Sequence, residues 1–148
     1  MIVREDILIS AEAIAPADYL ALVEDVGWSR FVQKSSVPVA LKNSLFSVVA
    51  RHGGAVVGAG RIVGDGAIFF YIQDVMVRKA YRKQGIGTAI VTALCEHLRE
   101  QAPDSSYVGL FTHPKKSGFY ERFGFHGPKP ALVGMYKGTK KKVKRSRT

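Results

Sequence analysis

Two closely spaced glycines, Gly85 and Gly87, lie in the stretch of this sequence that is best suited to binding a ligand. After them, apolar residues recur at spacings of three and four over residues 86–98, which predicts one face of a helix. A helix that begins at a glycine turn exposes backbone N–H groups at its positive end, and glycine lets a phosphate approach them closely. The turn also carries basic side chains, at Arg78, Lys79, Arg82 and Lys83. These residues therefore predict an anion site.

The alternative is that Gly85 and Gly87 only shape a tight turn and that the basic residues form a solvated loop. Their spacing matches neither the dinucleotide fingerprint G-x-G-x-x-G nor the P-loop pattern G-x-x-x-x-G-K-[ST]. A mostly apolar run over residues 67–77 precedes the turn and predicts a strand that crosses the centre of a sheet. The predicted unit is therefore a strand, a glycine turn and a helix.

The run Arg82-Lys83-Gln84-Gly85-Ile86-Gly87 fits the pattern R/Q-x-x-G-x-G/A. Together with the apolar strand before it, this run resembles the GNAT superfamily of acetyl-coenzyme A-dependent N-acetyltransferases. In that family the turn grips the pyrophosphate of coenzyme A, and the strand pairs with its pantetheine arm. The resemblance implies acetyl-CoA as the acyl donor, bound by Val75, Met76, Val77, Arg82, Lys83, Gln84, Gly85, Ile86, Gly87 and Thr88.

A second signature follows at the distance that the family leads us to expect. The run Gly118-Phe119-Tyr120-Glu121-Arg122-Phe123-Gly124-Phe125 resembles the GNAT pattern F-Y-x-x-x-G-F. The resemblance covers residues 2–137 as architecture, although its specific motifs occupy only residues 71–88 and 118–125. It implies an α/β (α+β) GNAT fold, with one mixed, mostly antiparallel sheet of about six to seven strands, a central splayed parallel pair and about four flanking helices.

Hydrophobic runs and turn residues place the individual elements. We expect strands over residues 2–9, 45–51, 55–63, 67–77, 107–112 and 131–137, and helices over residues 16–26, 35–43 and 87–100, with a short one ending at Gly124. Gly58 and Gly60 inside the third strand predict a bulge or a close approach by another group. If the two parallel strands part, the gap exposes backbone groups to which the amides of pantetheine could hydrogen-bond.

At 148 residues, with 47% hydrophobic residues, the chain is one domain by size and long enough to bury about 70% of its unfolded surface. We expect a GNAT domain over residues 1–137 and a basic, disordered tail over residues 138–148. Seven of the 22 Lys and Arg lie in residues 137–148, so the rest of the chain carries only +3 of the formal charge of +10. We therefore expect nucleic-acid contact only through the tail.

The composition also bears on location. No apolar run reaches 18 residues, and the N-terminus lacks a basic region followed by an apolar one. The single cysteine, Cys95, cannot form an internal disulfide, which suits a reducing compartment. We therefore expect a cytoplasmic protein with no signal peptide and no membrane contact. The four histidines and Cys95 are scattered, so no metal site is predicted.

Acetyl transfer to an amine requires a group that protonates the leaving thiolate and a donor that stabilises the oxyanion. The resemblance implies Tyr120 as the general acid, because the matching family tyrosine lies beside the sulfur of coenzyme A. The alternative is that Tyr120 only packs beside Phe119 and Phe123. The resemblance also implies the backbone N–H of Val75, or of a neighbour on the same strand, as the oxyanion donor.

The base is harder to assign. An alkylamine has a pKa of about 10.4, so making it neutral at pH 7 costs about 4.6 kcal/mol. The positions of the best-known family bases correspond to Tyr71 and Gln73, and neither is an obvious base. Asp74 is the only acid on this strand, and alternation would send it to the face opposite Gln73. Asp74 is our candidate for binding the ammonium group or acting through water; the alternative is that it fixes a neighbouring loop. His113 has a suitable intrinsic pKa, but His-Pro after a strand is more typical of a structural turn.

The segment between the first two strands covers the acceptor site in GNAT proteins. Trp28, Phe31 and Val37 are therefore candidates for lining an acceptor pocket, and the alternative for each is packing in the core. Val26-Gly27-Trp28 and residues 40–44 also resemble a GNAT subgroup of arylalkylamine-type and chloroplast-type enzymes. That resemblance favours a small or aromatic amine, although members of the subgroup are also linked to acetylation of protein lysines.

Our leading hypothesis is an N-acetyltransferase that transfers the acetyl group directly to a primary amine in a ternary complex, with no acetyl-enzyme. Cys95 would be a poor nucleophile because it lies on the predicted core helix. The resemblance allows a homodimer. The competing hypothesis is a non-catalytic module that binds coenzyme A for regulation, or a nucleic-acid-binding protein that uses its basic tail. A third hypothesis is transfer of a different acyl group.

Overall fold

The computed structural model describes residues 3–127 and 133–138. These residues fall into two compact units, Met1–Leu110 and Phe111–Thr148, and each unit is described by itself. The predicted basic tail lies outside the described residues except for Gly138. In the described part of the chain, no helix is long and apolar enough to cross a membrane.

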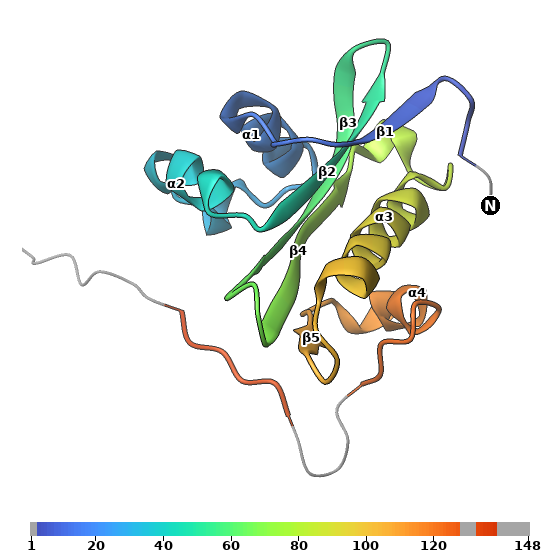
Figure 1. The fold of residues 1–148 in the computed structure, drawn as a ribbon. Coiled ribbons are helices and arrows are strands. Elements are labelled where there is room, and N and C mark those ends of the chain that lie inside the picture. The colour runs from blue at the N-terminus through green and yellow to red at the C-terminus, as the bar shows by residue number, and fades with distance from the viewer. Residues whose placement is uncertain (1–2, 128–132, 139–148) are drawn as a thin grey trace, which may run out of the picture. The chain divides into compact units, whose positions relative to one another are not determined.

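The first unit is built on one sheet whose strands follow the order of the chain (Figure 1). The strands are β1 (Ile7–Ala11), β2 (Phe46–His52), β3 (Ala55–Gly64), β4 (Phe69–Val77) and β5 (Tyr107–Gly109). The first four pair antiparallel, and β4 pairs parallel with β5. The predicted mixed sheet with a parallel pair is confirmed, with five strands in the described residues where we expected six or seven.

Helices cover both faces of this sheet (Figure 1). One face carries α1 (Pro16–Asp25) and α2 (Val37–Lys42), and the other carries α3 (Ile86–Gln101). Leu22 and Val23 of α1 are buried against Ala59 and Met76 of the sheet. These three helices lie within one residue of the expected bounds at most ends, because their apolar positions follow the helical period closely.

Two glycines of β3 allow α3 to approach the sheet closely. A Cβ atom at Gly58 would lie 3.0 Å from Ile90 Cδ1, and one at Gly60 would lie 2.8 Å from Ile90 Cγ2 and 3.0 Å from Leu94 Cδ1. The strand also has a register shift, since Ala50 pairs with Gly58 and Arg51 pairs with Val56, which leaves Val57 as an extra residue. Both features that the glycines predicted, a bulge and a close approach, are present.

Some strand boundaries differ from the expectation. β1 begins at Ile7 because the residues before it form a turn, in which the Ile7 N–H donates to the Arg4 carbonyl at 3.0 Å. β5 ends at Gly109 and not at residue 112. Of the predicted last strand, residues 133–137 have no regular structure and residues 131–132 lie outside the described residues.

The second unit contains α4 (Ser117–Glu121), which follows a short 3₁₀ turn at Pro114–Lys116. Gly124 adopts a left-handed conformation with φ of 86°, which ends the helical region as expected. The ring of Phe119 lies 4.9 Å from that of Tyr120 and 5.5 Å from that of Phe123, measured between centroids. The second motif therefore forms a compact aromatic cluster within this unit.

The close approach at Gly60 predicts the outcome of a small substitution. Gly60→Ala would force a methyl group against the Ile90 and Leu94 side chains, and overpacking of this kind costs about 1 to 3 kcal/mol. We expect a lower free energy of unfolding in a denaturant titration. Gly127→Ala is the control, because a Cβ there meets nothing within 4 Å. Equal stability of the two variants would contradict the packing described here.

Candidate functional site

A bulge in β4 shapes the site. Ala59 pairs with Met76 and Arg61 pairs with Gln73, so Gly60 alone faces two residues, Asp74 and Val75. Asp74 has φ of 55°, which is uncommon for a residue other than glycine. The extra residue breaks the alternation of side chains along the strand.

The bulge corrects one prediction. Alternation would have sent Gln73 and Asp74 to opposite faces, but both side chains line the same cavity, and Gln73 Nε2 lies 3.1 Å from Asp74 Oδ1. Val75 faces the other way, since its Cγ2 lies 3.4 Å from the Cβ position of Gly60, beside α3. Two polar side chains therefore reach one pocket from adjacent residues of a strand.

The parallel pairing of β4 with β5 ends at the last residue of β5, before the bulge is reached. Its last paired residues are Tyr71 of β4 and Gly109 of β5. β4 continues to Val77, and among the described residues no second strand pairs with it beyond Tyr71 on that edge. The predicted parallel pair is thus present. Val75, Met76 and Val77 lie on the part of β4 that continues beyond it.

The glycine turn leads from β4 into α3. Lys83 and Gly85 are left-handed, with φ of 60° and 79°, and the Ala89 N–H donates to the Gly85 carbonyl at 3.0 Å. The amides from Ile86 onward therefore open the first helical turn, where an α-helix makes no intrahelical bonds from its N–H groups. Ile86 is 1% exposed, so its side chain belongs to the core and only its backbone faces the turn.

Basic side chains and a hollow accompany this turn. Arg82 and Lys83 are exposed, and within the part of the chain that the structure describes neither forms an ion pair. A hollow of about 390 Å³ runs along one side of α3 from Gly85 to Glu96 and is also lined by Val3 and Ile9. The basic side chains and the open amides of the turn, rather than this hollow, are what would suit an anion.

The loop is anchored to the rest of the first unit by several hydrogen bonds. The Lys79 N–H donates to Asp25 Oδ2 at 2.7 Å, and Arg78 Nε donates to the Val56 carbonyl at 2.9 Å. Gln84 Nε2 donates to the Ala80 carbonyl at 3.3 Å within the loop. The loop is therefore anchored at both its beginning and its interior, while Arg82 and Lys83 remain exposed.

A second cavity of about 400 Å³ lies on the opposite face of the sheet. It is lined by α1, α2, the segment between them, β3 and β4. Trp28, Phe31 and Val37, the candidates for lining an acceptor pocket, all line this cavity. Trp28 and Phe31 are 39% and 71% exposed, so they do not serve as core residues, whereas Val37 is 2% exposed and also packs in the core. The cavity therefore has an aromatic rim.

Its floor is a buried ion pair. Arg61 Nε lies 2.8 Å from Asp74 Oδ2, and the two side chains are 11% and 6% exposed. The Tyr19 hydroxyl donates to the same carboxylate oxygen at 3.0 Å. Burial, and then the Asp74 charge, raise the pKa of Tyr19 to about 12, so its hydroxyl stays protonated and remains a donor. The Asp74 carboxylate is therefore held by three side chains, those of Arg61, Tyr19 and Gln73.

Sequence reasoning did not find Arg61 or Tyr19. Tyr19 lies 55 residues from Asp74, and no local pattern links the two positions. Arg61 did carry a signal, because it is the one charged residue in an otherwise apolar strand, and a charge there needs a buried partner.

The remaining candidates lie elsewhere. Tyr120 belongs to the second unit, where burial raises the pKa of its phenol and keeps it protonated near neutral pH. His113 Nδ1 accepts a hydrogen bond from the Lys115 N–H at 3.2 Å, which agrees with the structural-turn interpretation. Burial raises the pKa of the Cys95 thiol, which makes it a weaker nucleophile. No group of three metal-ligating side chains occurs among the residues that the structure describes.

Comparison with known proteins agrees with this geometry. Residues 43–127 match the acetyltransferase (GNAT) domain family. The chain is 32% identical over 130 residues to histone acetyltransferase TAP1 of Glycine max, with 80% of this chain and 55% of that protein covered. It is 32% identical over 82 residues to the chloroplastic serotonin N-acetyltransferase 2 of Oryza sativa subsp. japonica, with 55% and 40% covered. The chain thus spans about half the length of these relatives.

A solved structure is also similar. A protein of unknown function from meticillin-resistant Staphylococcus aureus superposes with a TM-score of 0.82 at 28% identity, covering 90% of this chain and 99% of that one. Because the family match extends over more than half of the sequence, the chain belongs to the GNAT acetyltransferase family.

The buried ion pair predicts a large effect on stability. Arg61→Ala would leave the Asp74 carboxylate buried without its cation, and breaking such a pair costs about 3 to 5 kcal/mol. We expect a clear fall in the denaturation midpoint. Arg51→Ala is the matched control, since its pair with Glu12 at 2.9 Å is about one-third exposed and should contribute little. If both variants lost the same stability, Asp74 would not depend on Arg61.

Proposed function

We propose that this chain transfers an acetyl group from acetyl-CoA directly to a primary amine in a ternary complex. The observation that carries the proposal is the bulged strand β4. One side of this strand presents Gln73 and Asp74 to a cavity, while no strand of the described residues pairs with its other edge beyond Tyr71. A donor on the open edge and an acceptor in the cavity would therefore meet at the same few residues.

The donor would extend along β4 and end at the glycine turn. Backbone groups of Val75, Met76 and Val77 would pair with the amides of pantetheine. The diphosphate would lie against the amides of residues 84–88, with the charges of Arg82 and Lys83 beside it. The N–H of Val75, next to the bulge, would donate to the oxyanion that forms on the acetyl group. The family's general use of acetyl-CoA supports this assignment.

The acceptor nitrogen would attack the thioester carbonyl, so that a C–N bond forms and the C–S bond breaks. Tyr120 would give its phenolic proton to the leaving thiolate and regain one from solvent. The Tyr120 phenol is protonated at working pH, as a general acid must be, and the pKa rise caused by burial makes it a weaker acid than an exposed tyrosine. The surplus proton of the amine would pass to water.

Asp74 would act on the acceptor through Gln73, whose side chain its contacts fix. The Arg61 guanidinium lines the same cavity and neutralises the Asp74 charge, so the pair does not itself attract an ammonium group. An ionised carboxylate only accepts hydrogen bonds, so Gln73 must turn its Nε2 toward Asp74 Oδ1. The amide oxygen of Gln73 is then the acceptor that would receive an N–H of the incoming amine. The bond from Tyr19 and the Arg61 pair also support the alternative that Asp74 fixes neighbouring elements, and both roles are compatible.

The acceptor is a small or aromatic amine, or a lysine side chain. The aromatic rim of Trp28 and Phe31 supports an amine with an apolar body. The soybean relative is named for histone and the rice relative for serotonin, so both acceptor classes occur among proteins similar to this one. A homodimer in the cytoplasm is the setting we propose, and the rice relative is named as chloroplastic.

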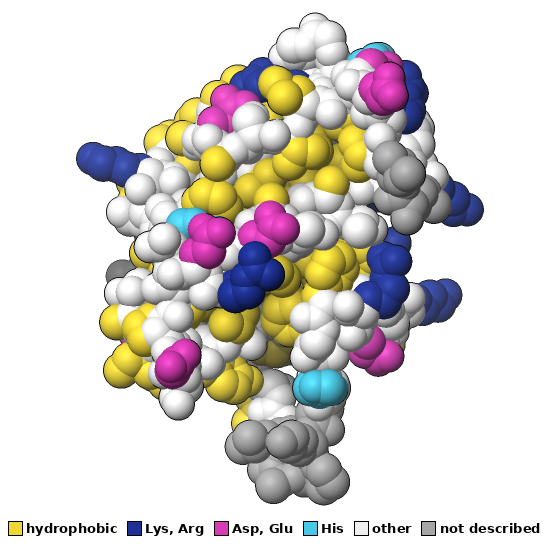
Figure 2. Space-filling model, turned by 45° about the vertical axis from the view of Figure 1, so that its right-hand side comes forward, with side chains coloured by type: hydrophobic (Ala, Val, Ile, Leu, Met, Phe, Trp, Pro, Cys, Tyr) yellow, Lys and Arg dark blue, Asp and Glu magenta, His cyan; other side chains and the backbone are white. Residues whose placement is uncertain are grey.

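On the face shown in Figure 2, Lys and Arg side chains occur at the left, centre and right of the view, and Asp and Glu side chains lie among them. This face therefore does not favour a nucleic-acid-binding alternative. A non-catalytic module would bind coenzyme A without turnover.

The proposed enzyme activity is tested by incubating the chain with acetyl-CoA and a panel of arylalkylamines and lysine peptides, and by measuring thiol release and the acetylated product. Binding without product for every amine would favour the module, and no binding would exclude both.

The role of Tyr120 predicts a selective loss of rate. Tyr120→Phe should lower kcat by about 100-fold or more, because general acid catalysis commonly contributes that much, while the Kd for acetyl-CoA stays unchanged. Tyr136→Phe, at a tyrosine that is 91% exposed, is the control. An unchanged kcat in Tyr120→Phe would mean that Tyr120 only packs beside its aromatic neighbours.

The role of Gln73 predicts an effect on the acceptor alone. Gln73→Leu keeps the side-chain size but removes the amide oxygen, together with the Nε2 group that donates to Asp74. The KM for the amine should rise about tenfold, the cost of a well-placed hydrogen bond. The KM for acetyl-CoA should not change. Gln101→Leu, at the exposed end of α3, is the matched control. An unchanged amine KM in Gln73→Leu would remove Gln73 from the acceptor site.

A further inference from the structure

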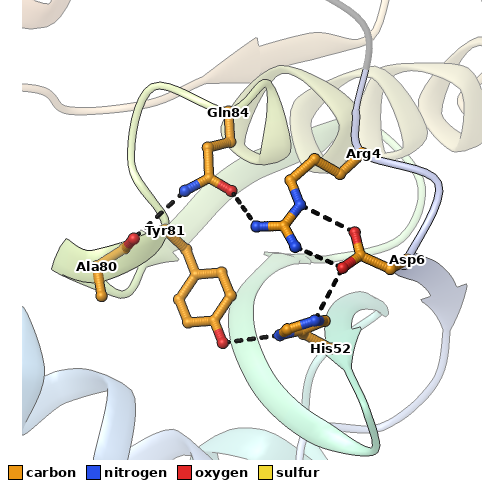
Figure 3. Close-up of polar contacts among 6 residues, drawn as sticks. All are labelled: Arg4, Asp6, His52, Ala80, Tyr81 and Gln84. Atoms are coloured by element: carbon orange, nitrogen blue, oxygen red, sulfur yellow. Dashed lines mark hydrogen bonds and ion pairs between the residues drawn. The ribbon is translucent and has the colours of Figure 1, made fainter.

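A chain of polar contacts joins the glycine turn to the start of the molecule (Figure 3). His52 Nδ1 lies 2.9 Å from the Tyr81 hydroxyl, and His52 Nε2 lies 2.9 Å from Asp6 Oδ2. Arg4 binds the Asp6 carboxylate through Nε, which lies 2.9 Å from Oδ1, and through Nη2, which donates to Oδ2. The Nη1 of Arg4 lies 3.3 Å from Gln84 Oε1. We call Arg4, Asp6, His52 and Tyr81 the loop clamp.

His52 is held by more than these two hydrogen-bonding contacts. His52 is the last residue of β2 and pairs with Ile7 of β1, so its ring is held beside the residues that precede β1. Its ring also lies edge-on to the Tyr81 ring, with centroids 5.5 Å apart. The ring is half-buried and has a partner on each nitrogen.

The chemistry of the partners fixes the direction of each hydrogen bond. The Arg4 guanidinium holds the pKa of Asp6 below its ordinary value, so the carboxylate is ionised and only accepts. His52 Nε2 must therefore carry the hydrogen that Asp6 receives. In the neutral imidazole, Nδ1 is then an acceptor, and the Tyr81 hydroxyl donates to it. The two hydrogen bonds that link Tyr81 to His52 and His52 to Asp6 thus each join one donor to one acceptor.

The loop has a reason to need such a clamp. Residues 79–85 include two left-handed residues, Lys83 and Gly85, and several exposed basic side chains that repel one another. Left-handed residues and like charges both disfavour this conformation, and a site that is competent only part of the time binds its ligand more weakly by that fraction. The clamp holds the loop at two points, Tyr81 and Gln84, on either side of the basic residues.

We infer that the loop clamp is a positioning network that holds residues 79–85 in the conformation that receives the diphosphate of the acyl donor. The inference rests on the proposed function for the identity of the ligand. None of the four clamp residues lines the acceptor cavity. The clamp acts on affinity for the donor, through the loop, and does not act on the chemical step.

The test uses the full chain with Tyr81→Phe, which removes one hydroxyl and keeps the ring, with His52→Phe, and with the double variant. The Kd for acetyl-CoA should rise about fivefold in each single variant, as expected for one hydrogen bond. The Kd of the double variant should be no higher than that of the single variant with the higher Kd, because both changes break the same chain of hydrogen bonds. Neither kcat at saturating donor nor the KM for the amine should change. Tyr107→Phe, at an exposed tyrosine beside the start of β4, is the control.

Hydrogen exchange in the absence of any ligand separates this inference from the proposed function. Tyr81→Phe should speed amide exchange over residues 79–85 and leave β4 unchanged. An unchanged Kd together with unchanged exchange would overturn the clamp, as would a fall in kcat with no change in Kd. If the unaltered chain bound no acetyl-CoA, the proposed function would fail, and the exchange rates alone would still decide whether the clamp orders the loop.

Discussion

The bulge in β4 depends on one buried interaction, the pairing of Arg61 with Asp74. A left-handed backbone at a residue other than glycine costs of the order of 1 to 3 kcal/mol and persists only where its surroundings hold it. Here three donors bind the Asp74 carboxylate, and Gly60 leaves room on the facing strand. Without those bonds β4 could regain regular alternation, and Gln73 and Asp74 would no longer share a cavity.

This arrangement lets one strand serve several purposes. Met76 packs in the core against α1, Val75 faces α3, and Gln73 reaches the cavity. Beyond Val77 the chain passes at once into the basic turn and the start of α3. The core therefore fixes the position of the site, because the residues that would touch both substrates are neighbours of residues buried in the hydrophobic interior.

Local patterns predicted the parts of the fold that local forces determine. The sequence predicted the helix over Ile86 to Leu98, the close approach at the two glycines of β3, and the glycine turn. Each of these reflects a steric or packing requirement of nearby residues. The residues of β4 alone did not predict its bulge, since the bulge depends on which residues of β3 lie opposite. The same holds for Tyr19 and His52, whose partners Asp74 and Asp6 are distant in sequence and come close only through the sheet. The length of β5 was overestimated because its apolar residues continue after pairing has ended.

The central claim is that an acyl donor lies along the open edge of β4 with its diphosphate at the start of α3. Amide hydrogen exchange of the full chain, measured with and without acetyl-CoA, tests it most directly. The account predicts that the donor slows exchange over residues 75–77 and 84–88 and leaves the edge strand β1 unchanged. Slowed exchange that is confined to other segments, or no change at saturating acetyl-CoA, would contradict it.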